Sequence, residues 1–406
     1  MSREKSGLPQ VLLVATVLVV AANLRPAISA VGPLLEQIRT DTGLSPSLLG
    51  LLGAIPVLSF GVISPFVAGI AARWGLERSI FASLLLLAVG TVLRSLPPGA
   101  LPGDESTSAQ LSLLSGTVIL SAAIGVGNVL VPAVVKRDFP TRVPFMTGLY
   151  TATMAGFAAL ASGTAVPISR LGGWELALGA GALIALIAAG VWAVRLREPD
   201  LATGALPLSP VSGSSRSSTV WTSAVAWQVT AYFALQSTLF YLLLTWYPSM
   251  LAYQGIGEAY AGWMLSLWQG IGIVASLTVG PVLQRSRDQR LVAALVCTSL
   301  AASLIGLVAA PALVPLWSLL GGFSTGTMLL LALTMITLRA STTHEAGQLS
   351  GMAQGVGYLC AGSGPLLAGA AFDLTGSWMP VIVGMLVATA LLAGVGMLAG
   401  RAVTLR

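Results

Sequence analysis

Arg25 is the residue of this chain best placed to do chemistry, because it is a charge inside a long apolar run and Pro26 follows it directly. If that run crosses a membrane, burying the charge costs roughly 2.5–3.5 kcal/mol on insertion scales, so something must offset the cost. Pro26 disfavours helical geometry at Arg25 and leaves the Ala22 carbonyl without its usual donor, which predicts a broken or kinked helix. A half-helix beginning there would direct its positive end and the guanidinium at the same anion. We therefore expect Arg25 to bind a negative or electron-rich ligand.

A structural role for Arg25 is the alternative. The side chain could instead hold its helix against backbone carbonyls of a neighbouring helix. The sequence offers no Asp or Glu deep inside an apolar run as a salt-bridge partner. That pattern favours a ligand over a purely structural role.

Two asparagines extend the same candidate site. Asn23 lies two residues before Arg25, and Asn128 lies four residues before Pro132. Because proline has no N–H, Pro132 leaves the Asn128 carbonyl without its helical hydrogen bond. Both asparagines could therefore hydrogen-bond a substrate.

A second group of polar and aromatic residues lies in the later part of the chain. Gln354 and Tyr358 are four residues apart and so share one face of a helix. The other members of this group are Gln236, Tyr241 and Trp246. Hydrogen bonding between helices explains each single residue about as well as substrate contact does. Their recurrence in both parts of the chain favours substrate contact for the set.

The elements that position these residues follow from composition. The chain has 406 residues, of which 55% are hydrophobic and only 8% are charged, and its mean hydropathy is +0.88. A water-soluble domain of this length could not expose such a composition. Apolar stretches of roughly 18 to 30 residues recur between short polar breaks, each long enough to cross a hydrocarbon core about 30 Å thick. The sequence therefore predicts an all-α polytopic membrane protein with twelve transmembrane helices.

The twelve expected spans form two sets of six. The first set is Pro9–Ile38, Ser47–Ala72, Ser79–Leu96, Leu111–Val135, Val143–Ile168 and Trp174–Val194. The second set is Val220–Leu251, Tyr260–Leu283, Leu291–Val308, Val314–Leu338, Leu349–Phe372 and Trp378–Leu398. Residues 195–219, rich in Ser, Pro and Arg, separate the sets and are expected to be a solvated cytoplasmic linker. We thus expect an N-terminal six-helix bundle over 1–194 and a C-terminal one over 220–406.

The basic residues indicate the orientation in the membrane. With the amino terminus inside, the outer side carries only Arg39, Arg94 and Arg170. The cytoplasmic segments then carry Arg3, Lys5, Arg73, Arg78, Lys136, Arg137, Arg142, Arg195, Arg197, Arg216, Arg285, Arg287, Arg290, Arg339, Arg401 and Arg406. The positive-inside rule therefore predicts a multi-pass protein of a bacterial-type inner membrane with both termini in the cytoplasm. Met1–Ala30 could also be a signal peptide, but Arg25 and Pro26 would then lie between its apolar core and the cleavage point.

Several other classes of protein are disfavoured by the sequence. The distribution of the basic residues among membrane loops argues against nucleic-acid binding despite a pI near 9.7. Cys297 and Cys360, the two cysteines, both fall inside expected spans, so neither a disulfide framework nor a cysteine metal site is indicated. No Walker A loop, HExxH motif or paired intramembrane carboxylates appear, which argues against an enzyme or an ATP-driven pump. We expect no cofactor and no metal, and a monomer whose partners are a small-molecule substrate and the bilayer.

Several runs of residues carry a family resemblance. Residues 23–26 (Asn-Leu-Arg-Pro), the stretch 127–140 and the stretch 349–358 resemble the cyanate permease and 2-nitroimidazole transporter family, a branch of the major facilitator superfamily. Residues 226–228 and 236–248 add to the match. The resemblance implies two pseudo-symmetric six-helix bundles, alternating access and a substrate site between the halves. It also implies substrates that are cyanate-like anions or nitroimidazole-like rings.

One loop motif departs from the superfamily. The loop after the second span normally carries an aspartate directly before an arginine, but here Ala72 precedes Arg73. The usual charge lock between helices is therefore in doubt, and we expect that Arg73 could pair elsewhere, for instance with Glu77.

The preferred hypothesis is a secondary or facilitative transporter that holds a small anion or a polar heteroaromatic on Arg25. The first alternative is a proton-driven drug or metabolite exporter with an aromatic pocket formed by Tyr241, Trp246, Trp268 and Tyr358. The second is a membrane-embedded sensor or enzyme. The residues near a possible proton path, Glu36 and Asp373, lie near the outer ends of their expected helices. We therefore expect facilitated flux, exchange or coupling through the protonation of the substrate itself.

Overall fold

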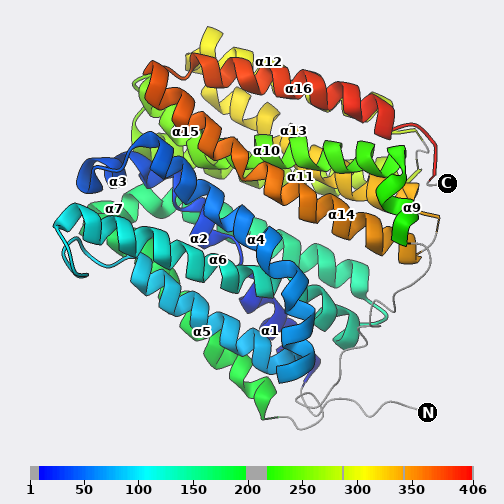
Figure 1. Ribbon diagram of the computed structural model, residues 1–406, viewed down its shortest axis with the longest axis horizontal. Coiled ribbons are helices and arrows are strands. Elements are labelled where there is room, and N and C mark those ends of the chain that lie inside the picture. The colour runs from blue at the N-terminus through cyan, green and yellow to red at the C-terminus, as the bar shows by residue number, and fades with distance from the viewer. Residues whose placement is uncertain (1–8, 198–216, 286–287, 342, 405–406) are drawn as a thin grey trace. The chain divides into compact units, whose positions relative to one another are not determined.

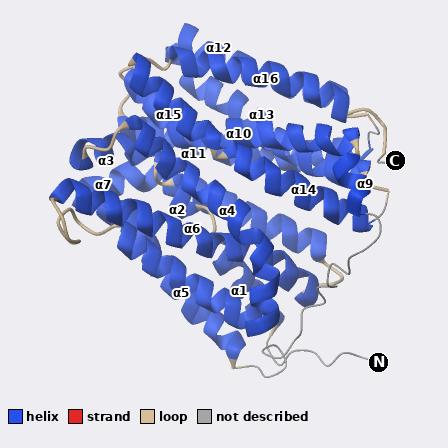
Figure 2. Ribbon diagram, in the orientation of Figure 1, coloured by secondary structure: helices blue, strands red, loops and turns tan. Residues whose placement is uncertain are grey.

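A computed structural model describes residues 9–197, 217–285, 288–341 and 343–404. Within these ranges the chain forms helices and loops and no strand (Figure 2). The expectation of an all-helical protein is confirmed. Most of the expected linker lies outside the described residues.

The helices gather into two compact units. Unit 1 comprises the described parts of 1–43 and 62–210, and unit 2 comprises the described parts of 44–61 and 211–406. The helix α4 (Pro46–Trp74) begins in unit 2 and ends in unit 1. The second expected span is thus shared by both units, whereas the sequence placed it wholly in the N-terminal bundle.

Unit 1 is built around three long helices that pack on one another. These are α5 (Leu76–Arg94), α6 (Glu105–Asp138) and α7 (Val143–Leu196). Helix α5 packs against α6 and α7, and α7 also packs against the short N-terminal helices (Figure 1). Asp104 caps α6, since its carboxylate accepts a hydrogen bond from the Thr107 backbone N–H at 3.4 Å.

The first span of unit 1 is divided into four pieces. They are α1 (Gln10–Ala21), α2 (Pro26–Ser29), the 3₁₀ turn η1 (Gly32–Leu34) and α3 (Leu35–Thr42). Arg25 precedes α2 with φ −126° and ψ −31°. The break expected at Arg25 and Pro26 is confirmed.

Unit 2 contains the second set of spans. Its helices are α9 (Ser217–Thr222), α10 (Ala224–Tyr253), α11 (Glu258–Arg285), α12 (Arg290–Ala309), η2 (Pro311–Leu313), α13 (Val314–Arg339), α14 (Thr343–Ala361), α15 (Ser363–Thr375) and α16 (Met379–Ala399). Helix α10 packs against α11, α13, α14, α15 and α16, so it lies at the centre of the unit. The eleventh expected span is interrupted at Gly362, between α14 and α15.

Eleven stretches of the described residues are long and apolar enough to cross a membrane. One of them, 145–196, is too long for a single crossing and is broken at Gly172 and Gly173, where φ is −170° and +76°. Glycine permits the positive φ that this turn requires. The break falls where the sequence separates the fifth and sixth spans, so the helices accommodate the twelve expected crossings.

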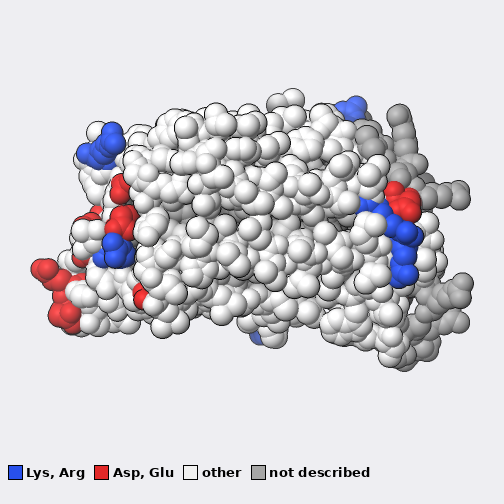
Figure 3. Space-filling view, turned by 90° about the horizontal axis from the view of Figure 1, so that it is seen from above, with Lys and Arg blue, Asp and Glu red and all other residues white. Residues whose placement is uncertain are grey.

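Charged side chains lie mainly at the helix ends. On the face shown in Figure 3, Lys, Arg, Asp and Glu gather at the two ends, and the surface between them is almost free of charge. An uncharged band of this kind suits contact with lipid chains. The C-terminal end of α7 differs from expectation: Arg195, which the sequence assigned to the solvated linker, belongs to the last turn of α7 and is completely buried.

Candidate functional site

Arg25 lies at the break of the first span. Its backbone carbonyl accepts hydrogen bonds from the N–H groups of Ile28 and Ser29, so Arg25 is the residue from which the short helix α2 begins. Its side chain is half-buried, although it comes from the middle of an apolar segment. The break therefore places a guanidinium partway along the span 10–42 of unit 1 rather than at either end of that span.

The helix after the break is shorter than expected. Helix α2 has four residues and is followed by the 3₁₀ turn, so no long half-helix begins at Arg25. A helix dipole needs several aligned turns. The chemistry available at this point is therefore that of the guanidinium itself: a planar, permanently charged group that can bind anions through two parallel hydrogen bonds.

The two asparagines of the site differ in how they are engaged. Asn23 is buried and its amide donates to the Val19 carbonyl at 2.8 Å. Asn128, on α6, is half-buried. Close packing joins the two elements, because a methyl group added at Gly127 would lie 2.5 Å from a methyl carbon of Leu24. Asn23, Arg25 and Asn128 thus come from neighbouring parts of unit 1.

Aromatic residues of unit 2 converge on Tyr358. The ring centroids of Phe233, Phe60 and Tyr241 lie 5.4, 6.3 and 6.5 Å from that of Tyr358, all edge-to-face. Phe240 packs in turn on Tyr241 at 5.2 Å. Sequence reasoning identified the two tyrosines but missed the phenylalanines, because an apolar ring in an apolar helix gives no distinguishing signal.

Two amides of unit 2 are engaged along their own helices. The Gln236 amide donates to the Ser237 hydroxyl at 2.7 Å, and the Gln354 amide donates to the Ser350 hydroxyl at the same distance. Gln236 is buried and Gln354 is half-buried. Each amide nitrogen donates to a hydroxyl of its own helix, a partner that a substrate could replace.

The tryptophans of the alternative aromatic pocket serve helix packing. The Trp246 indole N–H donates to the Pro365 carbonyl at 2.9 Å, and its ring packs on Trp378. The Trp268 N–H donates to the Thr325 hydroxyl at 3.0 Å. Both rings are buried, so in this structure their polar atoms are committed to the protein.

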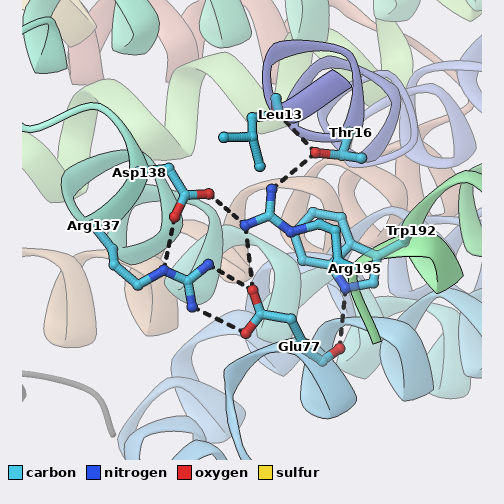
Figure 4. Close-up of polar contacts among 7 residues, drawn as sticks. All are labelled: Leu13, Thr16, Glu77, Arg137, Asp138, Trp192 and Arg195. Carbon is cyan, nitrogen blue, oxygen red and sulfur yellow. Dashed lines mark hydrogen bonds and ion pairs between the residues drawn. The ribbon is translucent and has the colours of Figure 1, made fainter. Parts of the chain in front are cut away.

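Four charged side chains form a ring where α5 begins and where α6 and α7 end, and the sequence did not predict this ring. Glu77 of α5, Arg137 and Asp138 of α6, and Arg195 of α7 alternate in sign around it (Figure 4). Arg137 donates to both carboxylate oxygens of Glu77, at 2.5 and 3.0 Å, and to Asp138 at 2.7 Å. Arg195 donates to Glu77 at 3.3 Å and also to Asp138. We call these four residues the charge ring.

Three neutral contacts support the charge ring. Arg195 also donates to the Thr16 hydroxyl of α1 at 3.0 Å (Figure 4). Its guanidinium lies 4.6 Å from the centroid of the Trp192 ring, and the Trp192 N–H donates to the Glu77 backbone carbonyl at 3.0 Å. The ring therefore fastens α1, α5, α6 and α7 together.

The charge ring corrects one expectation. Glu77 is bound by Arg137 and Arg195, while Arg73 is exposed, so the suggested pairing of Arg73 with Glu77 is wrong. The physical reason is burial: two arginines already surround the buried Glu77 carboxylate. Opposite charges at three helix ends, Glu77, Asp138 and Arg195, are the signal that could have suggested the ring.

Comparison with known proteins agrees with this architecture. The sequence pattern of the Major Facilitator Superfamily matches residues 17–368. The chain is 38% identical to the 2-nitroimidazole transporter of Escherichia coli (strain K12) over 401 residues, covering 98% of each chain. It is 28% identical to the cyanate transport protein CynX of the same organism over 363 residues, covering 89% of this chain and 90% of the relative.

A solved structure shows the same fold. The crystal structure of a bacterial homologue of the human lysosomal transporter Spinster superposes with a TM-score of 0.77 at 15% identity, covering 97% of both chains. At that identity the likeness concerns the fold alone. Taken with the sequence match, it means that this chain belongs to the Major Facilitator Superfamily, in the branch that contains the 2-nitroimidazole and cyanate transporters, and is a membrane transporter of small molecules rather than an enzyme.

Proposed function

We propose that this transporter carries a small anion or a polar heteroaromatic, cyanate-like or nitroimidazole-like, by alternating access, and that Arg25 holds the negative or electron-rich edge of the substrate. The observation that carries the proposal is the half-buried guanidinium at the break of the first span. The names of the two relatives, a 2-nitroimidazole transporter and a cyanate transport protein, support the substrate class.

The chemistry of the two ligand types explains how one arginine could serve both. Cyanate carries a full negative charge, and the nitro oxygens and unprotonated ring nitrogen of a nitroimidazole are hydrogen-bond acceptors. A guanidinium offers only donors, in a planar fork, and so matches both. Asn23 and Asn128 supply further hydrogen-bonding groups within unit 1.

Unit 2 contributes a different kind of group to the proposal. Tyr241 and Tyr358 offer ring faces and hydroxyls, and Gln236 and Gln354 offer amides. Aromatic side chains bind flat rings by offset or edge-to-face contacts, which suits a heteroaromatic substrate. We assign Trp246 a supporting part, because it holds α10 against α15.

Energy coupling is proposed to need no dedicated proton-carrying carboxylate. Glu36 is paired with Arg39 at 2.5 Å, and Asp373 accepts a hydrogen bond from the Ser47 backbone N–H at 2.8 Å. The two buried carboxylates of the charge ring are each bound to two arginines. We therefore propose facilitated flux, exchange, or coupling through the protonation of the substrate.

For the remaining features of the transporter we propose a monomer in a bacterial-type inner membrane with both termini in the cytoplasm. Cysteine labelling tests the orientation. A cysteine placed at Ser214 should resist an impermeant thiol reagent in intact cells, and labelling from outside would contradict the proposed topology.

A thermal-shift titration with cyanate and with 2-nitroimidazole tests the substrate assignment. A ligand that binds only the folded protein raises the melting temperature with concentration. Arg25→Ala should remove the shift and leave the protein folded, and Arg25→Lys should weaken binding by about tenfold, because an ammonium keeps the charge but loses the planar fork. Arg39→Gln, which removes an exposed arginine, is the matched control.

Three results would contradict the proposal. If lipophilic cations rather than these ligands stabilise the wild-type protein, the result favours the alternative of a drug exporter. If Arg25→Ala is poorly folded and the surviving fraction binds normally, Arg25 only holds its helix in place. Ligand binding without flux into sealed vesicles would favour a sensor.

A further inference from the structure

Arg94 lies at the C-terminal end of α5, and its side chain donates a hydrogen bond to the broken first span. Its side chain is only 1% exposed, and its Nη1 donates to the Ala27 carbonyl at 2.7 Å. Ala27 belongs to α2 and comes two residues after Arg25. A buried arginine from another helix is thus bonded to the short segment that follows Arg25.

The backbone of Arg94 is held firmly against α6. A methyl group added at Gly116 would lie 2.6 Å from the Arg94 Cα, and one added at Gly90 would lie 2.6 Å from the Leu120 backbone nitrogen. Real side chains do not approach backbone atoms so closely, so α5 and α6 can meet this tightly only because both positions are glycine. Arg94 is therefore a fixed point from which its guanidinium reaches Ala27.

A hydrogen bond to the Ala27 carbonyl does not by itself require a charged donor such as Arg94. Within the described residues its Nε and Nη2 atoms are buried without a hydrogen-bond partner, and no ion pair joins it to an acid. A neutral donor could bond to one carbonyl with a smaller desolvation penalty. Stability alone thus gives no reason for an arginine at this position.

We propose that Arg94 is a positioning residue for the substrate: by holding the Ala27 carbonyl it fixes the break and keeps Arg25 aimed at its ligand. This inference rests on the proposed function, because it requires Arg25 to contact the substrate.

The affinity for cyanate, measured by thermal shift on purified full-length protein, tests the proposal. Arg94→Gln should weaken cyanate binding by about tenfold or more, whereas Arg94→Lys, which keeps the charge and one donor, should stay within about threefold of the wild type. A merely structural role would lower the melting temperature but leave the affinity of the folded fraction unchanged.

A double-mutant cycle tests whether Arg94 acts through Arg25. In an Arg25→Lys background, Arg94→Gln should lower the affinity for cyanate by less than about threefold, because the guanidinium that Arg94 positions is already absent. Equal losses in both backgrounds would mean that Arg94 acts independently of Arg25, and would overturn the inference.

Gly116→Ala provides a second variant in case Arg94→Gln folds poorly. The added methyl displaces the Arg94 backbone without altering its guanidinium, so cyanate affinity should again fall about tenfold. Gly148→Ala is the matched control, since a methyl group there meets nothing within 4 Å. Wild-type affinity in folded Arg94→Gln or folded Gly116→Ala would overturn the inference.

The same measurements separate this inference from the proposed function. If Arg25→Lys weakens cyanate binding and Arg94→Gln does not, only the role of Arg94 is wrong. If the wild type binds cyanate and Arg25→Lys leaves the affinity unchanged, the role of Arg25 itself is wrong, and the role assigned to Arg94 is wrong with it.

Discussion

Both units fasten helix ends together with a buried arginine, but they satisfy its charge differently. In unit 1, the third, fourth and sixth spans meet at the charge ring, where Arg195 is bound by Glu77 and Asp138. In unit 2, the corresponding spans meet at Arg339, which donates to the Ala399 carbonyl at 2.9 Å and to the Gln289 side chain, and which is also attracted by the exposed Asp288 carboxylate. The Gln289 backbone N–H donates in turn to the Gly400 carbonyl at 3.0 Å.

This difference predicts how the stability of each unit should respond when a mutation removes one of these buried groups. Removing one member of a buried ion pair leaves an uncompensated charge, whereas removing a charge that is bound to neutral dipoles leaves only unsatisfied neutral groups. We therefore expect unit 1 to depend on its ring far more than unit 2 depends on Arg339. The following variants are ordered by expected effect.

Glu77→Gln should have the largest effect. It leaves Arg137 and Arg195 sharing one carboxylate, and the free energy of unfolding should fall by about 3–5 kcal/mol. Thermal unfolding of the purified protein in detergent measures the loss. A melting temperature equal to that of Glu36→Gln would show that the ring does not hold unit 1 together.

Arg339→Met should have an intermediate effect. The Ala399 carbonyl and the Gln289 side chain lose a donor, but no buried charge is left behind, so we expect a loss of about 1–3 kcal/mol. The same unfolding measurement applies, with Arg401→Met as a half-buried control in this unit. A loss as large as that of Glu77→Gln would remove the distinction between the units.

Trp192→Phe should have a smaller effect, because it removes only the hydrogen bond from the indole N–H to the Glu77 carbonyl beside the charge ring. Phenylalanine keeps an aromatic face near Arg195 but cannot donate to the Glu77 carbonyl, which should cost about 1–2 kcal/mol. Trp263→Phe, at an exposed ring, serves as the control in the same unfolding assay. If Trp192→Phe is neutral, the indole N–H does not help to orient Glu77.

Glu36→Gln should have the smallest effect. Glu36 and Arg39 form a 2.5 Å ion pair on adjacent turns of α3, with side chains 45% and 47% exposed. Exposed pairs contribute below about 1 kcal/mol, and salt screens them. Stability should therefore change little on mutation; a loss comparable with that of Glu77→Gln would mean that burial does not set the strength of these pairs.

Much of the fold could be predicted from local sequence. Long apolar runs gave the spans, Gly172 and Gly173 mark the boundary between the fifth and sixth spans, and Pro26 marks the break after Arg25. Each of these signals acts on the backbone within a few residues. The interruption of the eleventh span at Gly362 was not predicted, because glycine is common in tightly packed membrane helices and one more glycine gave no distinguishing signal.

The candidate site was only partly accessible to the same reasoning. Arg25, Tyr241 and Tyr358 stand out because charged and polar groups are rare in apolar runs. Arg94 did not stand out, because a charge at the end of a span is usually solvated, whereas here the Gly116 contact draws it into the interior. Phe60 and Phe233 could not be distinguished from other apolar residues before their rings met Tyr358.

The sequence by itself determined the membrane class, the order of the spans, the broken first helix and the family, because these depend on composition, short-range backbone chemistry and recognisable runs of residues. Only the tertiary structure decided which polar groups meet. Arg195 binds Asp138 and Thr16, which are 57 and 179 residues away, and Arg94 binds Ala27, 67 residues away. A hydropathy pattern reports whether a residue tends to be buried, but the partner that makes burial of a charge tolerable is fixed only when distant helices pack together.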